Sequence, residues 1–144
     1  MSVDKARELF LSGYNCAQAI AGGFSDKVGL EESKALSLSS CFGAGIAATR
    51  GLCGALSGAM MILGLVKQYD KPDDKAKAYA DGKKLLSDFK EEFSSTQCCE
   101  LLTVCKARYA DTPSERTPEY YRARPCVAIV EFVANWLTDN LNLN

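Results

Sequence analysis

The sequence contains no histidine, and this absence excludes much of the usual chemistry of enzyme active sites. No imidazole is available as a general base, as a metal ligand or as an axial ligand of haem. Serine and cysteine nucleophiles that a neighbouring histidine activates are excluded for the same reason. We therefore expect no haem and no histidine-dependent nucleophilic catalysis.

An excess of charge of either sign is also lacking. The 144 residues include 17 basic and 18 acidic side chains, which leave a formal net charge of −1. This balance argues against binding to nucleic acid through phosphate contacts and against a polybasic membrane anchor. The most apolar run, residues 52–66, contains glycines and a serine and is shorter than the ~20 residues of a membrane-spanning helix. We expect no nucleic-acid partner and no membrane insertion.

The beginning of the chain does not have the pattern of a secretory signal. Residues 1–8 are typical of the start of a charged amphipathic helix and lack a basic segment followed by an apolar one. We therefore expect a protein of the reducing cytoplasm, where structural disulfides are rare. Cysteines in that compartment more often bind metal or carry out redox chemistry.

Apolar residues recur with helical spacing along most of the chain, and no segment shows convincing strand alternation. Breaks such as Pro72 separate the periodic segments, because proline lacks the N–H donor that a helix interior requires. We predict an all-α fold, a single compact bundle of five or six helices that forms one domain over residues 1–144. The expected helical segments are residues 3–24, 31–41, 51–69, 79–93, 97–108 and a last helix beginning at Pro125, with a further turn over 119–124 and an ordered loop over 111–118.

The chain is rich in one reactive residue type. Its seven cysteines are Cys16, Cys41, Cys53, Cys98, Cys99, Cys105 and Cys126. Because seven is an odd number, a monomer with every cysteine in a disulfide is excluded. Each cysteine taken alone is equally well explained as a small buried hydrophobic residue without chemistry.

Four of the cysteines lie on the inward faces of four different predicted helices, namely Cys16, Cys53, Cys98 and Cys126. Four thiolates that meet at one point suit an iron–sulfur cluster or a zinc ion. Without metal, the same thiols would be able to cycle between dithiol and disulfide. No CxxC pair fixes two ligands locally, so the fold has to bring the four together. We take them as the candidate metal ligands and, in a metal-free protein, as the candidate catalytic redox thiols.

The glycine-rich segment 51–58 is the most specific stretch of the chain. Gly54 and Gly58 are four positions apart, so one helix face is nearly bare backbone and permits either close helix packing or the close approach of a bound group. Together with Ala55 they are the candidate cofactor-binding residues, and the N–H groups of Gly54 and Ala55 are the expected donors to sulfur. Cys53 lies near the start of the predicted helix, where the helix dipole favours a thiolate.

These motifs together resemble a family of small redox proteins that is named for the cysteine pattern C_GCAxxG_C_C. The matching residues are 15–19 (Asn-Cys-Ala-Gln-Ala), 53–58 (Cys-Gly-Ala-Leu-Ser-Gly), Cys98 and Cys126, and the resemblance extends over nearly the whole chain. It implies a redox role, and the related helical domains of split-Soret cytochromes imply an iron–sulfur cluster. This chain lacks both histidine and the CxxCH motif of those cytochromes, so haem is not implied.

Three cysteines, Cys41, Cys99 and Cys105, lie outside this pattern. Adjacent helical residues point about 100° apart, so we expect Cys98 to point inward and Cys99 to be a bystander. Cys105 follows Cys98 on the same predicted helix face and is the expected accessory ligand.

Two classes of function are compatible with the sequence. The first is a redox or metal-centre protein, with an unidentified redox partner, whose cysteine thiolates hold an iron–sulfur cluster for electron transfer or cycle between dithiol and disulfide; a structural zinc site is the alternative. The second is a non-catalytic helical module whose small-residue face and aromatic residues Tyr120, Tyr121 and Trp136 mediate binding or a homodimer.

Arg50 either stabilises a thiolate or is a surface residue beside a buried helix, and we favour the surface interpretation. Whether the protein is an enzyme stays open.

Overall fold

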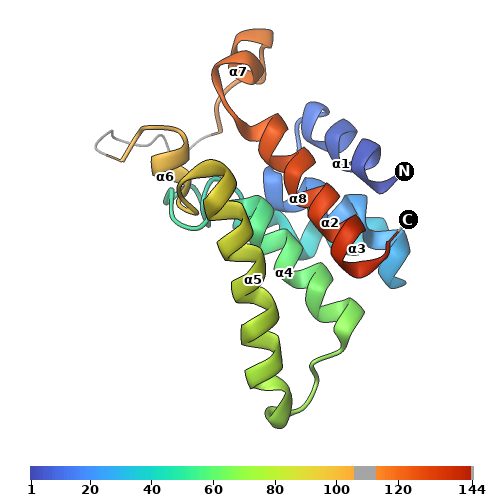
Figure 1. Ribbon diagram of the computed structural model, residues 1–144. Helices are drawn as coiled ribbons and strands as arrows, with labels where there is room; N and C mark the ends of the chain where they lie inside the picture. Colours follow the sequence, from blue (N-terminus) through green and yellow to red (C-terminus); the bar gives the residue numbers. More distant parts are fainter. Residues whose placement is uncertain (106–112, 144) are drawn as a thin grey trace.

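The computed structural model describes residues 1–105 and 113–143, and helices make up most of this part of the chain (Figure 1). The described residues contain eight α-helices: α1 (Ser2–Leu11), α2 (Cys16–Gly23), α3 (Glu32–Ser39), α4 (Gly54–Lys67), α5 (Lys75–Phe93), α6 (Cys98–Leu101), α7 (Pro118–Ala123) and α8 (Cys126–Leu141). Three short 3-10 helices are η1 (Ser25–Val28), η2 (Ser40–Phe42) and η3 (Pro72–Asp74). The all-α class is therefore confirmed, whereas the number of helices exceeds the five or six that we predicted.

The first predicted helix, residues 3–24, is in fact two helices. Gly13 has a φ of +107°, which ends the helical conformation after α1. Asn15 then caps α2: its side chain accepts a hydrogen bond from the Gln18 N–H over 2.9 Å, and the Gln18 side chain accepts one from the Asn15 N–H over 3.2 Å. Such a reciprocal capping box starts a helix at a defined residue. As a result, Cys16 is the first residue of α2 and not a residue within a long helix.

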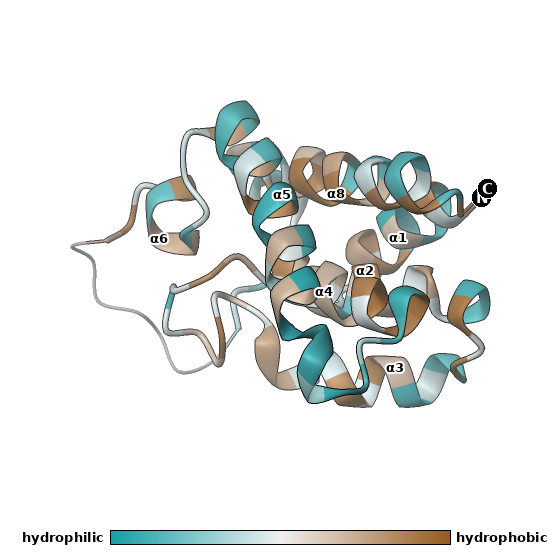
Figure 2. Ribbon diagram, turned by 60° about the horizontal axis from the view of Figure 1, so that its bottom comes forward, coloured by the Kyte–Doolittle hydropathy of each residue, from teal (hydrophilic) through white to brown (hydrophobic). Residues whose placement is uncertain are grey.

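The hydrophobic core lies where α1, α2, α4, α5 and α8 meet, and their apolar faces turn toward one another in Figure 2. The small-residue face of α4 packs directly on α2. A Cβ atom added to Gly58 would lie 2.7 Å from the Ala17 carbonyl oxygen and 3.1 Å from Ile20 Cβ, so only glycine permits this approach. The bare face of the motif helix is therefore used inside the chain.

Two other predicted helices differ in extent from those in the structure. The apolar stripe of α5 runs through Gly82, Leu85 and Phe89, which are buried, whereas Tyr79 is 65% exposed. The helix expected over 97–108 is only the four-residue α6, and the structure does not describe 106–112, where part of the expected loop also lies.

No helix in the described residues combines the length and the hydropathy needed to cross a bilayer.

Candidate functional site

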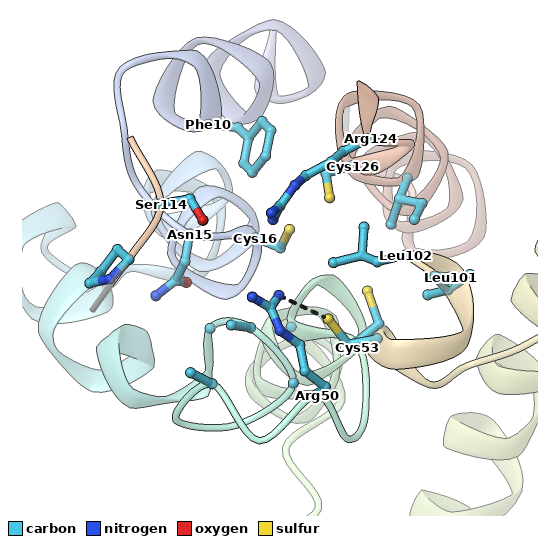
Figure 3. A pocket seen from close by; sticks show the side chains of 18 of the residues that line it. Phe10, Asn15, Cys16, Arg50, Cys53, Leu101, Leu102, Ser114, Arg124 and Cys126 are labelled. Atoms are coloured by element: carbon cyan, nitrogen blue, oxygen red, sulfur yellow. Dashed lines mark hydrogen bonds between the residues drawn. The ribbon is translucent and has the colours of Figure 1, made fainter. Parts of the chain in front are cut away.

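A cavity of about 430 Å³ brings the four predicted cysteines together (Figure 3). Each of them stands at a helix N-terminus: Cys16 begins α2, Cys53 is the N-cap residue of α4, Cys98 begins α6 and Cys126 begins α8. The N-terminus of a helix carries a partial positive charge from its aligned peptide dipoles, which favours thiolate over thiol. The four sulfur-bearing side chains thus share one cavity although they come from four separate segments.

Cys16 and Cys126 interact strongly with each other in this cavity, and each changes the pKa of the other. The hydrogen bond from Cys16 lowers the pKa of Cys126 to about 7, and the positive charges of Arg124 and Arg116 act in the same direction. The same hydrogen bond, together with burial, raises the pKa of Cys16 well above its ordinary value. The surroundings of the pair therefore favour a thiol at Cys16 and a thiolate at Cys126.

Cys53 has a different environment. It is 4% exposed, and burial raises the pKa of its thiol to about 12. The nearby backbone N–H groups of Ala55 and Leu56 lower this pKa and so oppose part of the effect of burial. The sulfur donors that we predicted at Gly54 and Ala55 stay a prediction; in the structure, the Leu56 N–H donates to the backbone carbonyl of Cys53 over 3.1 Å.

Cys98 is held against the loop that precedes α4. Arg50 Nη1 donates a hydrogen bond to Cys98 Sγ over 3.6 Å, drawn as the dashed line in Figure 3. The Cys98 N–H donates to the Gly51 carbonyl over 2.6 Å, and the Cys99 N–H donates to the Arg50 carbonyl over 3.0 Å. Arg50 is half-buried in the cavity wall, so the surface position that we favoured for it is wrong.

The loop that carries Arg50 has an unusual backbone. Its residues with positive φ are Ala44, Gly45, Ile46, Ala47, Ala48 and Arg50, with φ between 51° and 71°. A side chain in this left-handed region costs about 1–2 kcal/mol, and only glycine is exempt. Backbone hydrogen bonds hold the loop in place, among them Arg50 N–H to the Ala44 carbonyl over 2.9 Å. Strained backbone of this kind is concentrated at functional sites.

Sequence reasoning missed two further arginines that line the cavity, Arg116 and Arg124. Both stack on the ring of Tyr120, at 4.7 Å and 4.2 Å from its centroid. Arg116 also donates hydrogen bonds to the carbonyl of Phe10 over 3.3 Å and to that of Tyr14 over 3.1 Å, which ties this segment to the end of α1. Arg124 stands two residues before Cys126, and that spacing was the only local signal in the sequence.

Two of the three cysteines outside the family pattern are bonded to each other. Cys99 and Cys105 form a disulfide, so neither is the bystander or the accessory ligand that we expected. The sequence could not show this, because the pairing depends on a sharp reversal after α6 at Thr103, where φ is 56°. Gly54 lines the cavity, whereas Gly58 lies behind it against α2, and Cys41 is exposed.

The cysteines of the cavity do not form a preformed site for a single metal ion. Within residues 1–105 and 113–143, no three Cys, Asp or Glu side chains are close enough together to ligate one metal ion. The four cysteines line one cavity, but their sulfurs do not surround a common point at the short distances of a zinc site. A mononuclear site would therefore require the cavity wall to move inward.

Residues 14–140 match the model of one protein family, described as "Putative redox-active protein (C_GCAxxG_C_C)". The chain belongs to this family. No curated protein and no solved structure matches it. The family's redox description agrees with a site built from thiols, and all four cysteines of the C_GCAxxG_C_C pattern line the cavity, together with the exposed Cys41.

Proposed function

We propose that the protein is a thiol redox protein in which Cys16 and Cys126 interconvert between a dithiol and a disulfide. The observation that carries this proposal is that the two free thiols line one cavity, each at the start of a helix, and shift each other's pKa in opposite directions. Among the described residues the single disulfide joins Cys99 and Cys105, and Cys16 and Cys126 are free thiols.

The reaction needs a disulfide as the oxidant. The Cys126 thiolate attacks one sulfur of that disulfide, a mixed disulfide forms, and the first thiolate leaves. The Cys16 sulfur then attacks Cys126 Sγ, which forms the Cys16–Cys126 bond and releases the second thiolate. The proton of the Cys16 thiol passes to a departing thiolate. Two electrons have then moved from the protein dithiol to the oxidant, and the reverse sequence reduces the protein.

The two cysteines have different roles because their surroundings differ. Cys126 is the attacking group, since a hydrogen bond and nearby arginines stabilise its thiolate. Cys16 is the resolving group, since burial and the same hydrogen bond keep it protonated until the mixed disulfide has formed.

The proposal is tested by oxidising the reduced protein with one equivalent of a small disulfide and mapping the products by mass spectrometry. We expect a peptide pair joined through Cys16 and Cys126. In Cys16→Ser the reaction stops at a mixed disulfide on Cys126, whereas Cys126→Ser forms no such adduct. Cys41→Ser is the control, because Cys41 is an exposed thiol outside the pair. Oxidation that never joins residues 16 and 126 would disprove the proposal.

An iron–sulfur cluster on Cys16, Cys53, Cys98 and Cys126 is the second candidate. One observation favours it: all four cysteines line one cavity, each at the start of a helix. A bound cluster would supply one-electron transfer, with a potential that depends on burial and on N–H bonds to sulfur. Protein purified without oxygen should then be brown and contain iron and sulfide, whereas one colourless zinc per chain would indicate the structural alternative.

A non-catalytic module has less support. The small-residue face of α4 is occupied by α2, and Trp136 is 8% exposed with its Nε1 donating to Asp88 over 2.8 Å. These residues are therefore used within the chain. Replacing Cys16, Cys53, Cys98 and Cys126 together would still decide the matter, because a structural role predicts altered stability without any loss of redox response.

A further inference from the structure

The cysteine cavity is strongly positive. Three arginines line it, Arg50, Arg116 and Arg124, and among the described residues no aspartate or glutamate does. The first residues of α2, α4 and α8, each at least eight residues long, add the positive ends of three helix dipoles to the same space. Charge of one sign in a cleft with apolar walls raises the local concentration of ions of the opposite sign.

Two of these arginines face each other across the thiols. Arg50 enters from the left-handed loop and Arg124 from the segment before α8, and in Figure 3 both guanidinium groups point into the space beside Cys16. The ring of Tyr120 supports Arg124 from behind at 4.2 Å, and the Tyr120 hydroxyl accepts a hydrogen bond from Arg124 Nη1 over 3.3 Å. In the part of the chain that the structure describes, no carboxylate forms an ion pair with Arg116 or Arg124.

The rest of the wall is apolar. Its large apolar side chains are Phe10, Leu101, Leu102 and Ile129. A volume of about 430 Å³ lies within the ~300–1,000 Å³ of pockets that hold small organic ligands. The cavity therefore offers carbon contacts to the body of a ligand and guanidinium groups to its anionic ends.

Resting on the thiol redox role proposed above, we infer that the oxidant is a low-molecular-weight disulfide that carries carboxylate groups. Arg124 binds a carboxylate, and this places the disulfide sulfurs next to the Cys126 thiolate. The exchange then proceeds as described: Cys126 bonds to one sulfur, the carboxylated thiolate leaves, and Cys16 releases the second. An arginine binds a carboxylate through two parallel hydrogen bonds, which gives orientation as well as charge.

The experiment compares an anionic and an uncharged disulfide probe. Both react with reduced Cys41→Ser protein, which lacks the exposed thiol of Cys41. Dithiobis-nitrobenzoate carries a carboxylate on each ring, whereas dithiodipyridine is uncharged at neutral pH. Rate constants are measured by absorbance in stopped flow and divided by those of the same probes with 2-mercaptoethanol, a thiol without a carboxylate. The ratio of anionic to neutral probe then isolates recognition of the carboxylates from the reactivity of the thiol.

We expect this ratio to fall about tenfold in Arg124→Gln, because one of the opposing charges is lost. Arg122→Gln is the matched control: Arg122 lies two residues away, but its side chain is 71% exposed and pairs with Glu119. The control should keep the ratio of the parent protein. In the unmutated arginine background, raising the salt concentration from 0.05 M to about 1 M should also lower the ratio, since the screening length shrinks to ~3 Å.

The outcomes separate the inference from the proposed function. If both probes produce the Cys16–Cys126 disulfide but the ratio is the same in Arg124→Gln and insensitive to salt, carboxylate recognition is refuted and the thiol role stands. If neither probe produces that disulfide, the proposed function itself is wrong. Should Arg124→Gln not fold, the salt dependence of the parent protein decides between the first two results.

Discussion

Arg50 donates a hydrogen bond to Cys98 Sγ over 3.6 Å from a backbone position with φ of 62°. The Gly51 carbonyl accepts the Cys98 N–H over 2.6 Å, so main-chain contact supports the side-chain contact. A segment with several non-glycine residues in the left-handed region thus presents one cation to one thiol. The left-handed conformation of these residues is unfavourable, and favourable contacts elsewhere in the protein offset its free-energy cost.

Replacing a strained alanine of the loop by glycine should stabilise the protein. Ala47 has φ of 51°, and glycine adopts this conformation without the penalty that a Cβ atom brings. After allowing for the greater freedom of glycine in the unfolded chain, we expect Ala47→Gly to raise the free energy of unfolding by about 0.5–1 kcal/mol. Ala80→Gly, at an exposed position within α5, should lower it by about 1 kcal/mol. Urea unfolding checks both, and an equal loss in the two variants would contradict the prediction.

The reactivity of Cys126 should depend on pH near neutrality. Its pKa is lowered to about 7, so alkylation by iodoacetamide should rise through this pH and level off above it. The lowered pKa also means that ionisation of Cys126 favours the folded state above pH 9.0, its value without the fold, and that this contribution disappears as pH falls through about 7. Cys16→Ala removes the hydrogen bond and should shift the alkylation profile to higher pH. A profile for Cys126 centred near 9 in the unmutated protein would show that the hydrogen bond does not form.

Gly58→Ala should be destabilising because the added methyl group has no room. Its Cβ would lie 2.7 Å from the Ala17 carbonyl oxygen, which is backbone and cannot turn aside. We expect a loss of about 1–3 kcal/mol, as for other overpacked core sites. Gly64→Ala in the same helix is the control: nothing lies within 4 Å of the added Cβ, so the gain in helix propensity should stabilise by about 1 kcal/mol. Thermal unfolding distinguishes the two directions.

The Cys99–Cys105 disulfide should protect the start of α6 against opening. It closes a short loop directly after Cys98, and in the chain-entropy description such a loop contributes about 2 kcal/mol. In the double variant Cys99→Ser/Cys105→Ser, the amide hydrogen of Cys98, bonded to the Gly51 carbonyl, should exchange faster. Amide hydrogens of α4 serve as the internal reference. Unchanged exchange at Cys98 would mean that the backbone bonds to the loop hold α6 without the disulfide.

Local sequence signals identified much of the helical structure but not the residues at which one helix ends and the next begins. The apolar periodicity indicated helices correctly, and Thr117, which accepts a hydrogen bond from the Tyr120 N–H, shows why a turn begins near 118. The break between α1 and α2 was missed although Gly13 and Asn15 both mark it, because the apolar stripe continues across it. An apolar stripe indicates which residues are buried, whereas a capping residue determines where a helix starts. Here the cap at Asn15 determines the start of α2.

What the sequence by itself determined is the helical class, the C_GCAxxG_C_C pattern and the location of three of its cysteines, Cys53, Cys98 and Cys126, near predicted helix starts. These depend on interactions among residues a few positions apart, such as the capping of α2 by Asn15. Only the tertiary structure decided that Cys16 faces Cys126, that Arg50 reaches Cys98, and that Cys99 bonds to Cys105. The first two contacts join segments far apart in the chain. They exist because glycine in α4 lets α2 approach closely and a left-handed loop turns one arginine inward, and neither distance is encoded in local spacing.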